Sequence, residues 1–188
     1  MANPLTEPAL WREERARVFF ALWPDVATAN RLHALAEAAQ RRFGGRVMRF
    51  DTLHLTLLFV GGVRRVRLPE LIEAAASLTP PPFDLTLDTL GRWATRDIVW
   101  AGPSHAPPGL HELVADLHGR LRELGFELEA RRFVPHVTLL RGAECTDGQE
   151  PLAEPVRWRA DGFALVESKR QSSGARYRLL GRWAGADR

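Results

Sequence analysis

The chain has 188 residues, of which 45% are hydrophobic and 26% are charged, and its 26 basic residues exceed its 23 acidic residues by a net charge of +3. This balance is typical of globular proteins and excludes a wholly disordered chain. No apolar stretch approaches the roughly 18 residues that a transmembrane helix needs. The N-terminus also lacks the basic start and apolar run of a secretory signal. We therefore expect a cytoplasmic protein without a membrane partner.

The first half of the chain predicts alternating strands and helices. An apolar run stops at Pro24, Asp25 is placed to cap a helix, and Gly44 and Gly45 end it. The predicted elements are a strand at residues 18–23, a helix at 25–43, strands at 46–50 and 54–60, and a helix at 69–78.

The Thr-Pro-Pro-Pro segment at residues 79–82 is the expected boundary between two halves. The acidic stretch at residues 144–154 contains Pro and Gly and is interpreted as a solvated loop. The other predicted elements are strands at residues 83–88 and 98–101, a helix opened by Pro107 and closed by Gly125, and strands at 136–140, 163–168 and 176–183. Because helices and strands mix without a strict βαβ repeat, we predict an α+β fold. We expect one bilobal domain over residues 1–188, with a disordered extension at residues 1–15.

Basic residues concentrate in two segments. Residues 41–67 contain seven arginines against Asp51, and residues 157–182 contain seven basic residues against Asp161 and Glu167. Arginine accounts for 25 of the 26 basic residues, and its planar guanidinium suits phosphate oxygens. A codon bias of the genome is the alternative explanation for the arginine content, but the clustering suits a basic cleft for an anionic ligand.

One short pattern occurs twice. His54-Leu55-Thr56-Leu57-Leu58 and His136-Val137-Thr138-Leu139-Leu140 share the form His-apolar-Thr-Leu-Leu, and each follows an amphipathic helix. The repeat predicts two related lobes. Residues i and i+2 of a strand face the same side, so each histidine shares a face with its threonine. If the lobes pack with approximate two-fold symmetry, two imidazoles and two hydroxyls converge on one groove.

This set of groups suits displacement at phosphorus without a metal. A neutral imidazole takes a proton from water while an imidazolium gives one to the departing alkoxide, and histidine's ordinary pKa near 6.5 allows both forms near neutral pH. Threonine hydroxyls can donate hydrogen bonds to the phosphoryl oxygens. A metal site is the weaker alternative, because no third ligand lies at a recognisable spacing from either histidine. We therefore expect no cofactor.

Other candidate residues carry weaker signals. The histidines outside the repeat are interpreted as boundary, surface or loop residues: His33, His105, His111 and His118. Phe133 is the aromatic residue nearest to a motif and is a candidate for stacking on a nucleobase. The basic residues of the predicted C-terminal hairpin either follow an RNA backbone or form a solvated tip: Lys169, Arg170, Arg176 and Arg178.

The paired motifs resemble the two HxTx motifs of the 2H (two-histidine) phosphoesterase superfamily. The flanking strings are similar to those of bacterial and archaeal RNA 2′,3′-cyclic phosphodiesterases, formerly named 2′-5′ RNA ligases. These strings are Arg17-Val18-Phe19-Phe20-Ala21-Leu22, Ile98-Val99-Trp100-Ala101-Gly102, Phe133-Val134-Pro135 before the second motif, Arg141 after it, and Arg176-Tyr177. The resemblance implies two pseudo-symmetric lobes around a central cleft, each a small antiparallel sheet with outer helices.

The resemblance also implies an activity and a role for each site residue. The activity is hydrolysis of a 2′,3′-cyclic phosphate at an RNA end or on a small nucleotide to a 2′-phosphomonoester. His54 would be the general acid that protonates the 3′ oxygen, and His136 the general base that activates water. Thr56, Thr138 and Arg141 would hold the phosphate. A regular strand would point Arg141 away from His136, so we expect a bend or a strand end between them.

Two other functions stay open at this point. A module that binds RNA ends without chemistry would use the same arginines, but it would tolerate the change His54→Asn. Reversible 2′-5′ RNA ligation is a third possibility, which we rank as a side reaction because water outcompetes a second RNA end in dilute solution. We expect a monomer in each case.

Overall fold

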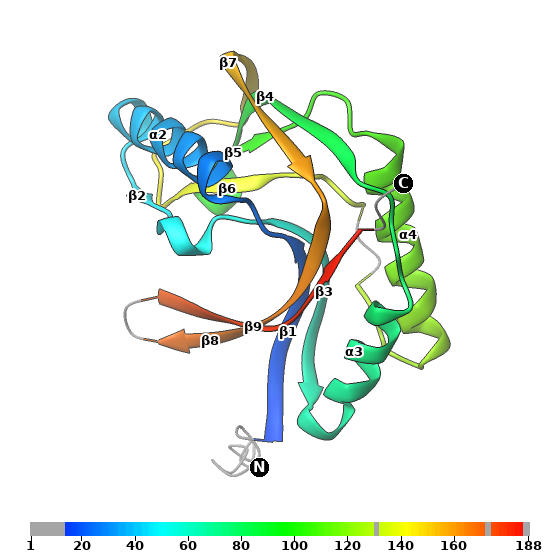
Figure 1. The fold of residues 1–188 in the computed structure, drawn as a ribbon. Helices are drawn as coiled ribbons and strands as arrows, with labels where there is room; N and C mark the ends of the chain where they lie inside the picture. Colours follow the sequence, from blue (N-terminus) through cyan, green and yellow to red (C-terminus); the bar gives the residue numbers. More distant parts are fainter. Residues whose placement is uncertain (1–13, 130–131, 172–173, 186–188) are drawn as a thin grey trace, which may run out of the picture.

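The computed structural model describes residues 14–129, 132–171 and 174–185. Within these residues, nine strands form one antiparallel sheet that curves strongly (Figure 1). The strand order is β7-β4-β5-β6-β3-β1-β8-β9, and β2 pairs with β6 outside this path. The fold is therefore α+β, as predicted, but the two small sheets expected for two lobes are joined into one.

The elements follow the predicted order closely. The first part of the chain contains β1 (Arg15–Leu22), α2 (Val26–Phe43), β2 (Arg46–Val47), the 3-10 turn η1 (Phe50–Thr52), β3 (Leu55–Arg64), the 3-10 turn η2 (Arg65–Arg67) and α3 (Leu68–Ala76). The second part contains β4 (Phe83–Trp93), the 3-10 turn η3 (Ala94–Arg96), β5 (Ile98–Gly102), α4 (Pro108–Glu123), β6 (Val137–Arg141), β7 (Gly148–Ala160), β8 (Gly162–Gln171) and β9 (Gly174–Ala184). Asp25 caps α2 as expected, accepting a hydrogen bond from the Thr28 amide at 2.6 Å.

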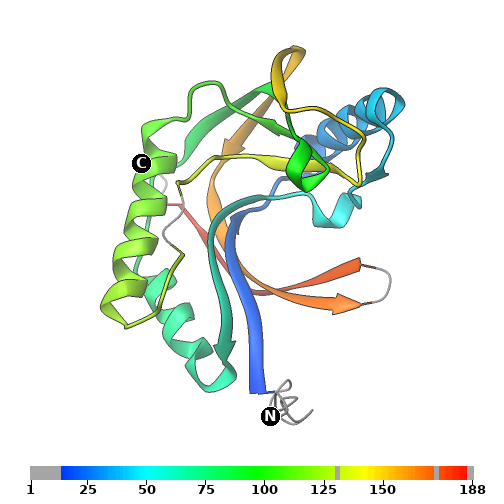
Figure 2. The ribbon, with the colours of Figure 1, turned by 180° about the vertical axis from the view of Figure 1, so that it is seen from behind.

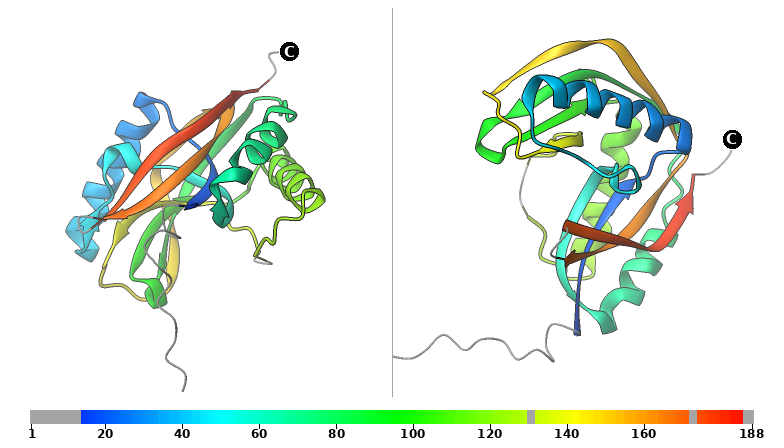
Figure 3. Two further views of the ribbon diagram at one scale, coloured as in Figure 1. Left: turned by 90° about the horizontal axis from the view of Figure 1, so that it is seen from below. Right: turned by 90° about the vertical axis from the view of Figure 1, so that its left-hand side faces the viewer.

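The sheet contains two halves that meet where β3 pairs with β6 at Leu55 and Val137. In one half β1 precedes α2 and β3, and in the other β5 precedes α4 and β6, which matches the repeat in the sequence. Each of these two helices packs against strands of the other half: α2 contacts β6 and β7, whereas α4 contacts β3. The two helices are in this sense exchanged between the halves. Helix α2 lies on one side of the molecule and α3 and α4 lie on the other (Figure 3). Each half therefore stabilises the other.

Each His-apolar-Thr-Leu-Leu motif contains a β-bulge. Residue Thr56 pairs with Ala21 and Leu58 with Phe20, so Leu57 is the extra residue on β3. In β6, Thr138 pairs with Trp100 and Leu140 with Val99, so Leu139 is the extra residue. A bulge shifts the alternation of side chains by one residue. Both leucines of each motif are therefore buried, and the residue after them returns to the face of the threonine.

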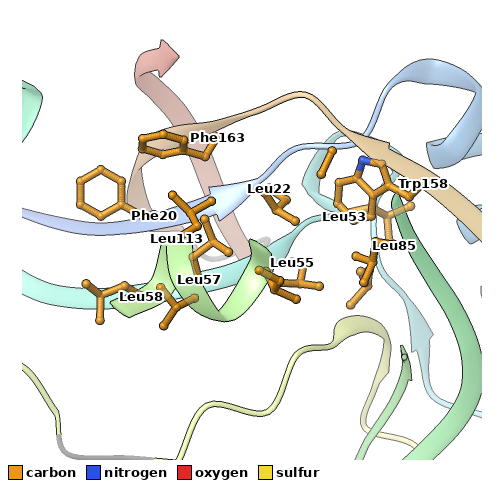
Figure 4. Packing of buried hydrophobic residues seen from close by; sticks show 14 of the residues in the cluster. Phe20, Leu22, Leu53, Leu55, Leu57, Leu58, Leu85, Leu113, Trp158 and Phe163 are labelled. Carbon is orange, nitrogen blue, oxygen red and sulfur yellow. The ribbon is translucent and has the colours of Figure 1, made fainter. Parts of the chain in front are cut away.

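The hydrophobic core lies behind the two motif strands. Figure 4 shows Leu55, Leu57 and Leu58 of β3 close to Leu113 of α4 and Phe20 of β1, and all five side chains are buried. Burial of this many apolar side chains makes the motif strands rigid, and rigid strands position reactive groups better than loops do. No helix in the described residues is long and apolar enough to cross a membrane.

The structure corrects three expectations. Residues 148–154 belong to β7 and not to a solvated loop, because β7 is an edge strand whose polar side chains face solvent while its later residues are buried. The strand expected at residues 46–50 is only β2, because η1 begins at Phe50. Residues 79–82 do lie between the two halves, because they join α3 to β4, but the chain crosses back after β7, since β8 pairs with β1. Of the expected extension at residues 1–15, Arg15 begins β1 and residues 1–13 lie outside the described residues.

Candidate active site

The five residues predicted from the motifs line one cavity. Its volume is about 180 Å³, and it lies between the segment around η1 and the β8–β9 hairpin, where the two motif strands meet. The predicted residues that line it are His54, Thr56, His136, Thr138 and Arg141. The two motifs are far apart in the sequence, and the continuous sheet, with its exchanged helices, brings them to one place.

Both imidazoles are held in the same way. The Nδ1 atom of His54 lies 2.6 Å from the carbonyl oxygen of Thr52, and Nδ1 of His136 lies 2.8 Å from that of Val134. A carbonyl oxygen only accepts, so each Nδ1 carries a hydrogen and donates it. This tautomer leaves Nε2 of each ring as the nitrogen that can exchange a proton with a ligand. Both histidines immediately precede their strands, which allows the ring to bond the carbonyl two residues earlier.

Aromatic rings surround His54. The indole of Trp23 stacks on the imidazole, with the rings 8° from parallel and their centroids 5.5 Å apart. Phe19 lies against the ring at 4.9 Å, and Tyr177 meets it edge to face at 5.3 Å. A tryptophan face attracts a cation, so Trp23 favours the imidazolium form of His54.

The surroundings of His136 differ. Trp93 meets its imidazole edge to face at a centroid distance of 4.7 Å, and Trp100 does so at 6.2 Å. No ring among the described residues stacks in parallel on His136 as Trp23 does on His54. The two halves therefore place related histidines in aromatic settings of different geometry.

Burial lowers the pKa of both histidines. The pKa of His54 falls to about 4 because desolvation penalises the imidazolium, although the hydrogen bond to Thr52 opposes this, and the charges of His136 and Arg141 lower it further. Desolvation also lowers the pKa of His136, aided by Arg96 and Arg141. Both imidazoles are therefore neutral at neutral pH in the free site.

The bulge in β6 explains the position of Arg141. A regular strand would have turned this side chain away from Thr138, but the extra residue Leu139 restores it to the face that lines the cavity. The bend expected between His136 and Arg141 is therefore a β-bulge. In β3 the equivalent position is Phe59, and the guanidinium of Arg17 lies over its ring at 4.6 Å.

Several residues that line the cavity were not predicted as site residues. Arg17 adds a second arginine, and the other additions are Phe19, Met48, Thr52, Phe59, Ser168 and Tyr177. Burial raises the pKa of the Tyr177 phenol, so its hydroxyl stays protonated and can donate. The alternation of side chains along β1, β8 and β9 could have indicated which of these residues share a face. It could not have indicated that β8 and β9 return beside β1.

The remaining candidates fall outside this cavity. His118 and Phe133 line a neighbouring cavity. His33 and His111 make ring contacts elsewhere, with Phe50 and Phe133. Of the hairpin residues, Arg178 is bound to the buried carboxylate of Glu167, so it is part of the fold and not of a free tip.

Two histidines, the two motif threonines and two arginines line one cavity, and groups of this kind can bind a phosphate ester. Comparison with known proteins gives the same class. The family model described as LigT like Phosphoesterase matches residues 22–100 and again residues 101–177. These two matches correspond to the two copies of the motif. The chain belongs to the LigT-like phosphoesterase family.

Individual relatives agree with this assignment. The chain is 35% identical over 140 residues to an RNA 2′,3′-cyclic phosphodiesterase of Escherichia coli, covering 74% of this chain and 80% of the relative. It is 27% identical over 175 residues to a protein of the same name from Thermotoga maritima, covering 87% of this chain and 92% of the relative. The crystal structure of E. coli LigT complexed with 3′-AMP has a TM-score of 0.83 and 31% identity, and the match covers 93% of this chain and 100% of that one.

Proposed function

We propose that this protein is an RNA 2′,3′-cyclic phosphodiesterase. The observation that carries the proposal is the convergence of His54 and His136, each held through Nδ1, with Thr56, Thr138 and Arg141 around one small cavity. The names of the relatives from Escherichia coli and Thermotoga maritima support the same substrate class.

The proposed reaction is an in-line displacement that needs two proton transfers. The cyclic phosphate lies between the imidazoles, where the hydroxyls of Thr56 and Thr138 and the guanidinium of Arg141 bind its oxygens. Nε2 of His136 removes a proton from water as the water oxygen bonds to phosphorus. The bond from phosphorus to O3′ breaks, and Nε2 of His54 gives its proton to O3′. The product is a 2′-phosphomonoester with a free 3′ hydroxyl.

The low pKa of His54 in the free site bears on its proposed role as the acid. A pKa of about 4 describes the free site, and the negative charge of a bound cyclic phosphate favours the imidazolium. The stack with Trp23 favours the same form. The substrate therefore helps to create the acid that its own leaving group requires.

The test is turnover of a nucleoside 2′,3′-cyclic phosphate in excess chelator, with the product isomer identified by phosphorus NMR. We expect a 2′-monophosphate formed without added metal. A lack of turnover, or turnover only with metal, would refute the proposal. A 3′-monophosphate product would show that O2′ is the leaving oxygen in place of O3′. The expectations of a monomer in the cytoplasm remain predictions.

A further inference from the structure

A second, larger cavity lies beside the phosphate site. Its volume is about 480 Å³, and it shares Thr56, Phe59 and His136 with the smaller cavity. Strand β3, helix α4, the turn η3 and the chain that leads into β6 line it, and Figure 2 shows these segments on the side that faces the viewer. The two cavities are therefore neighbours along one surface of the site.

The walls of this cavity combine aromatic and cationic groups. Trp93 and Phe133 contribute aromatic rings, in addition to the ring of Phe59, which lines both cavities. Arg96 and Arg132 contribute two guanidinium groups. Glu129 contributes one carboxylate, so the arginine charge exceeds it. Positive charge next to flat apolar surface is the composition that binds nucleotides, because bases stack on rings and phosphates bind arginine.

The size of the cavity suits a nucleoside. Sites for small molecules and cofactors range from about 300 to 1,000 Å³, and the phosphate cavity alone is below that range. A mononucleotide whose phosphate lies between His54 and His136 has no further phosphate to reach Arg96. An RNA chain has one at every nucleotide.

We propose that this cavity binds the nucleotide that precedes the terminal 2′,3′-cyclic phosphate of an RNA substrate. Its base lies against Trp93 and Phe133, and its phosphodiester group lies near Arg96 and Arg132. The inference rests on the proposed function and extends it, because it makes the end of an RNA chain a better substrate than a cyclic mononucleotide. His118 of α4, which the motifs leave unexplained, forms part of the wall.

The test compares kcat/KM for a nucleoside 2′,3′-cyclic phosphate and for a dinucleotide that ends in the same group. The wild-type protein should favour the dinucleotide by about tenfold or more, the effect of roughly one base stack. His118→Trp fills the cavity from α4 and should remove most of this preference while leaving the mononucleotide within about twofold. Asp116→Trp adds the same bulk to an exposed position of α4 and should keep the preference.

A second variant tests the charge of the cavity wall, at an arginine whose guanidinium also lies over the Trp93 ring at 5.7 Å. Arg96 is exposed, and Arg96→Gln should lower the dependence of log kcat/KM on log salt by about 0.7 more for the dinucleotide than for the mononucleotide. Each substrate is measured at the variant's own pH optimum, because Arg96 also lowers the pKa of His136. Arg159→Gln, at an exposed ion pair with Asp84, should leave the slope unchanged.

The outcomes separate this inference from the proposed function. If the wild-type protein hydrolyses neither substrate, the proposed function fails. If it hydrolyses both equally well, or if His118→Trp and Arg96→Gln affect both substrates alike, the second cavity does not bind the preceding nucleotide.

Discussion

The two histidines share one hydrogen-bonding pattern but differ in their surroundings. Both have a pKa below the ordinary value because burial penalises the imidazolium. The rate at low substrate concentration reflects the free site, whereas kcat reflects the complex. We therefore predict a bell-shaped profile of kcat/KM with its optimum below pH 6.5, and a profile of kcat displaced to higher pH by the bound anion. An optimum of kcat/KM above pH 7 would contradict the lowered pKa values. Because the two histidines interact, each limb of the profile reports a pKa of the pair and not of one histidine.

Trp23 gives a residue-scale test of the acid. Trp23→Leu removes the ring face that stacks on His54, and a cation–π contact is worth about 0.5–2 kcal/mol. We expect one limb of the kcat profile to move down by roughly 0.5 to 1 pH unit. Trp23→Phe, which keeps a ring, should move it less. The leaving group of an activated aryl phosphodiester needs no acid. If the site accepts such a substrate, the pH profile of kcat for its hydrolysis should not shift. An equal shift on both substrates would point to a general structural effect.

At the scale of elements, one buried carboxylate fixes the β8–β9 hairpin. Glu167 is 1% exposed and is bound by Arg65 from η2 and Arg178 from β9. Burial alone would raise its pKa, but the hydrogen bond from Arg65 and the charges of Arg65 and Arg178 hold the pKa below the usual value. A lowered pKa in the folded state means stabilisation that is present above about pH 4.5 and is lost as the pH falls through the folded value.

Replacement of this carboxylate should therefore have a pH-dependent effect. Glu167→Gln is expected to lower the free energy of unfolding by about 1–3 kcal/mol at pH 7, since both arginines keep partial access to water. The difference from wild type should shrink at pH 3, because the stabilisation from the lowered pKa of Glu167 declines below about pH 4.5. Asp84→Asn, at an exposed pair, should change stability by less than about 1 kcal/mol. Urea unfolding at both pH values measures this, and a loss that is equal at pH 3 and pH 7 would contradict it.

The elements also show what the sequence could and could not predict. Apolar periodicity and caps placed α2 and α4 well, because helix signals are local. The strand β7 was missed because polar residues at a sheet edge resemble those of a loop. The motif residues were found because the repeat marks them, whereas Arg17 and Tyr177 depend on which strands become neighbours. The bulge at Leu139 could be anticipated from Arg141, but its position depends on the register with β5.

At the scale of the whole molecule, the exchange of helices bears on domain organisation. We propose that the described chain folds as a single domain, because α2 packs on the half that contains β6 and α4 packs on β3. Leu32 of α2 is fully buried, and Leu32→Ala should lower the free energy of unfolding by about 2–5 kcal/mol. Far-UV circular dichroism and tryptophan fluorescence should report one coincident transition. Two separate transitions would show that the halves unfold independently.

The central claim is that His54 and His136 divide proton donation and proton removal between them. The most direct measurement is kcat for His54→Ala and His136→Ala on a nucleoside 2′,3′-cyclic phosphate and on an activated aryl phosphodiester. We predict that each variant loses at least about 10² in kcat on the cyclic phosphate. On the aryl ester, His54→Ala should recover much of its rate and His136→Ala should not, because only the acid becomes unnecessary. Recovery by His136→Ala would exchange the two roles. Unimpaired hydrolysis of the cyclic phosphate by either variant would contradict the two-histidine mechanism.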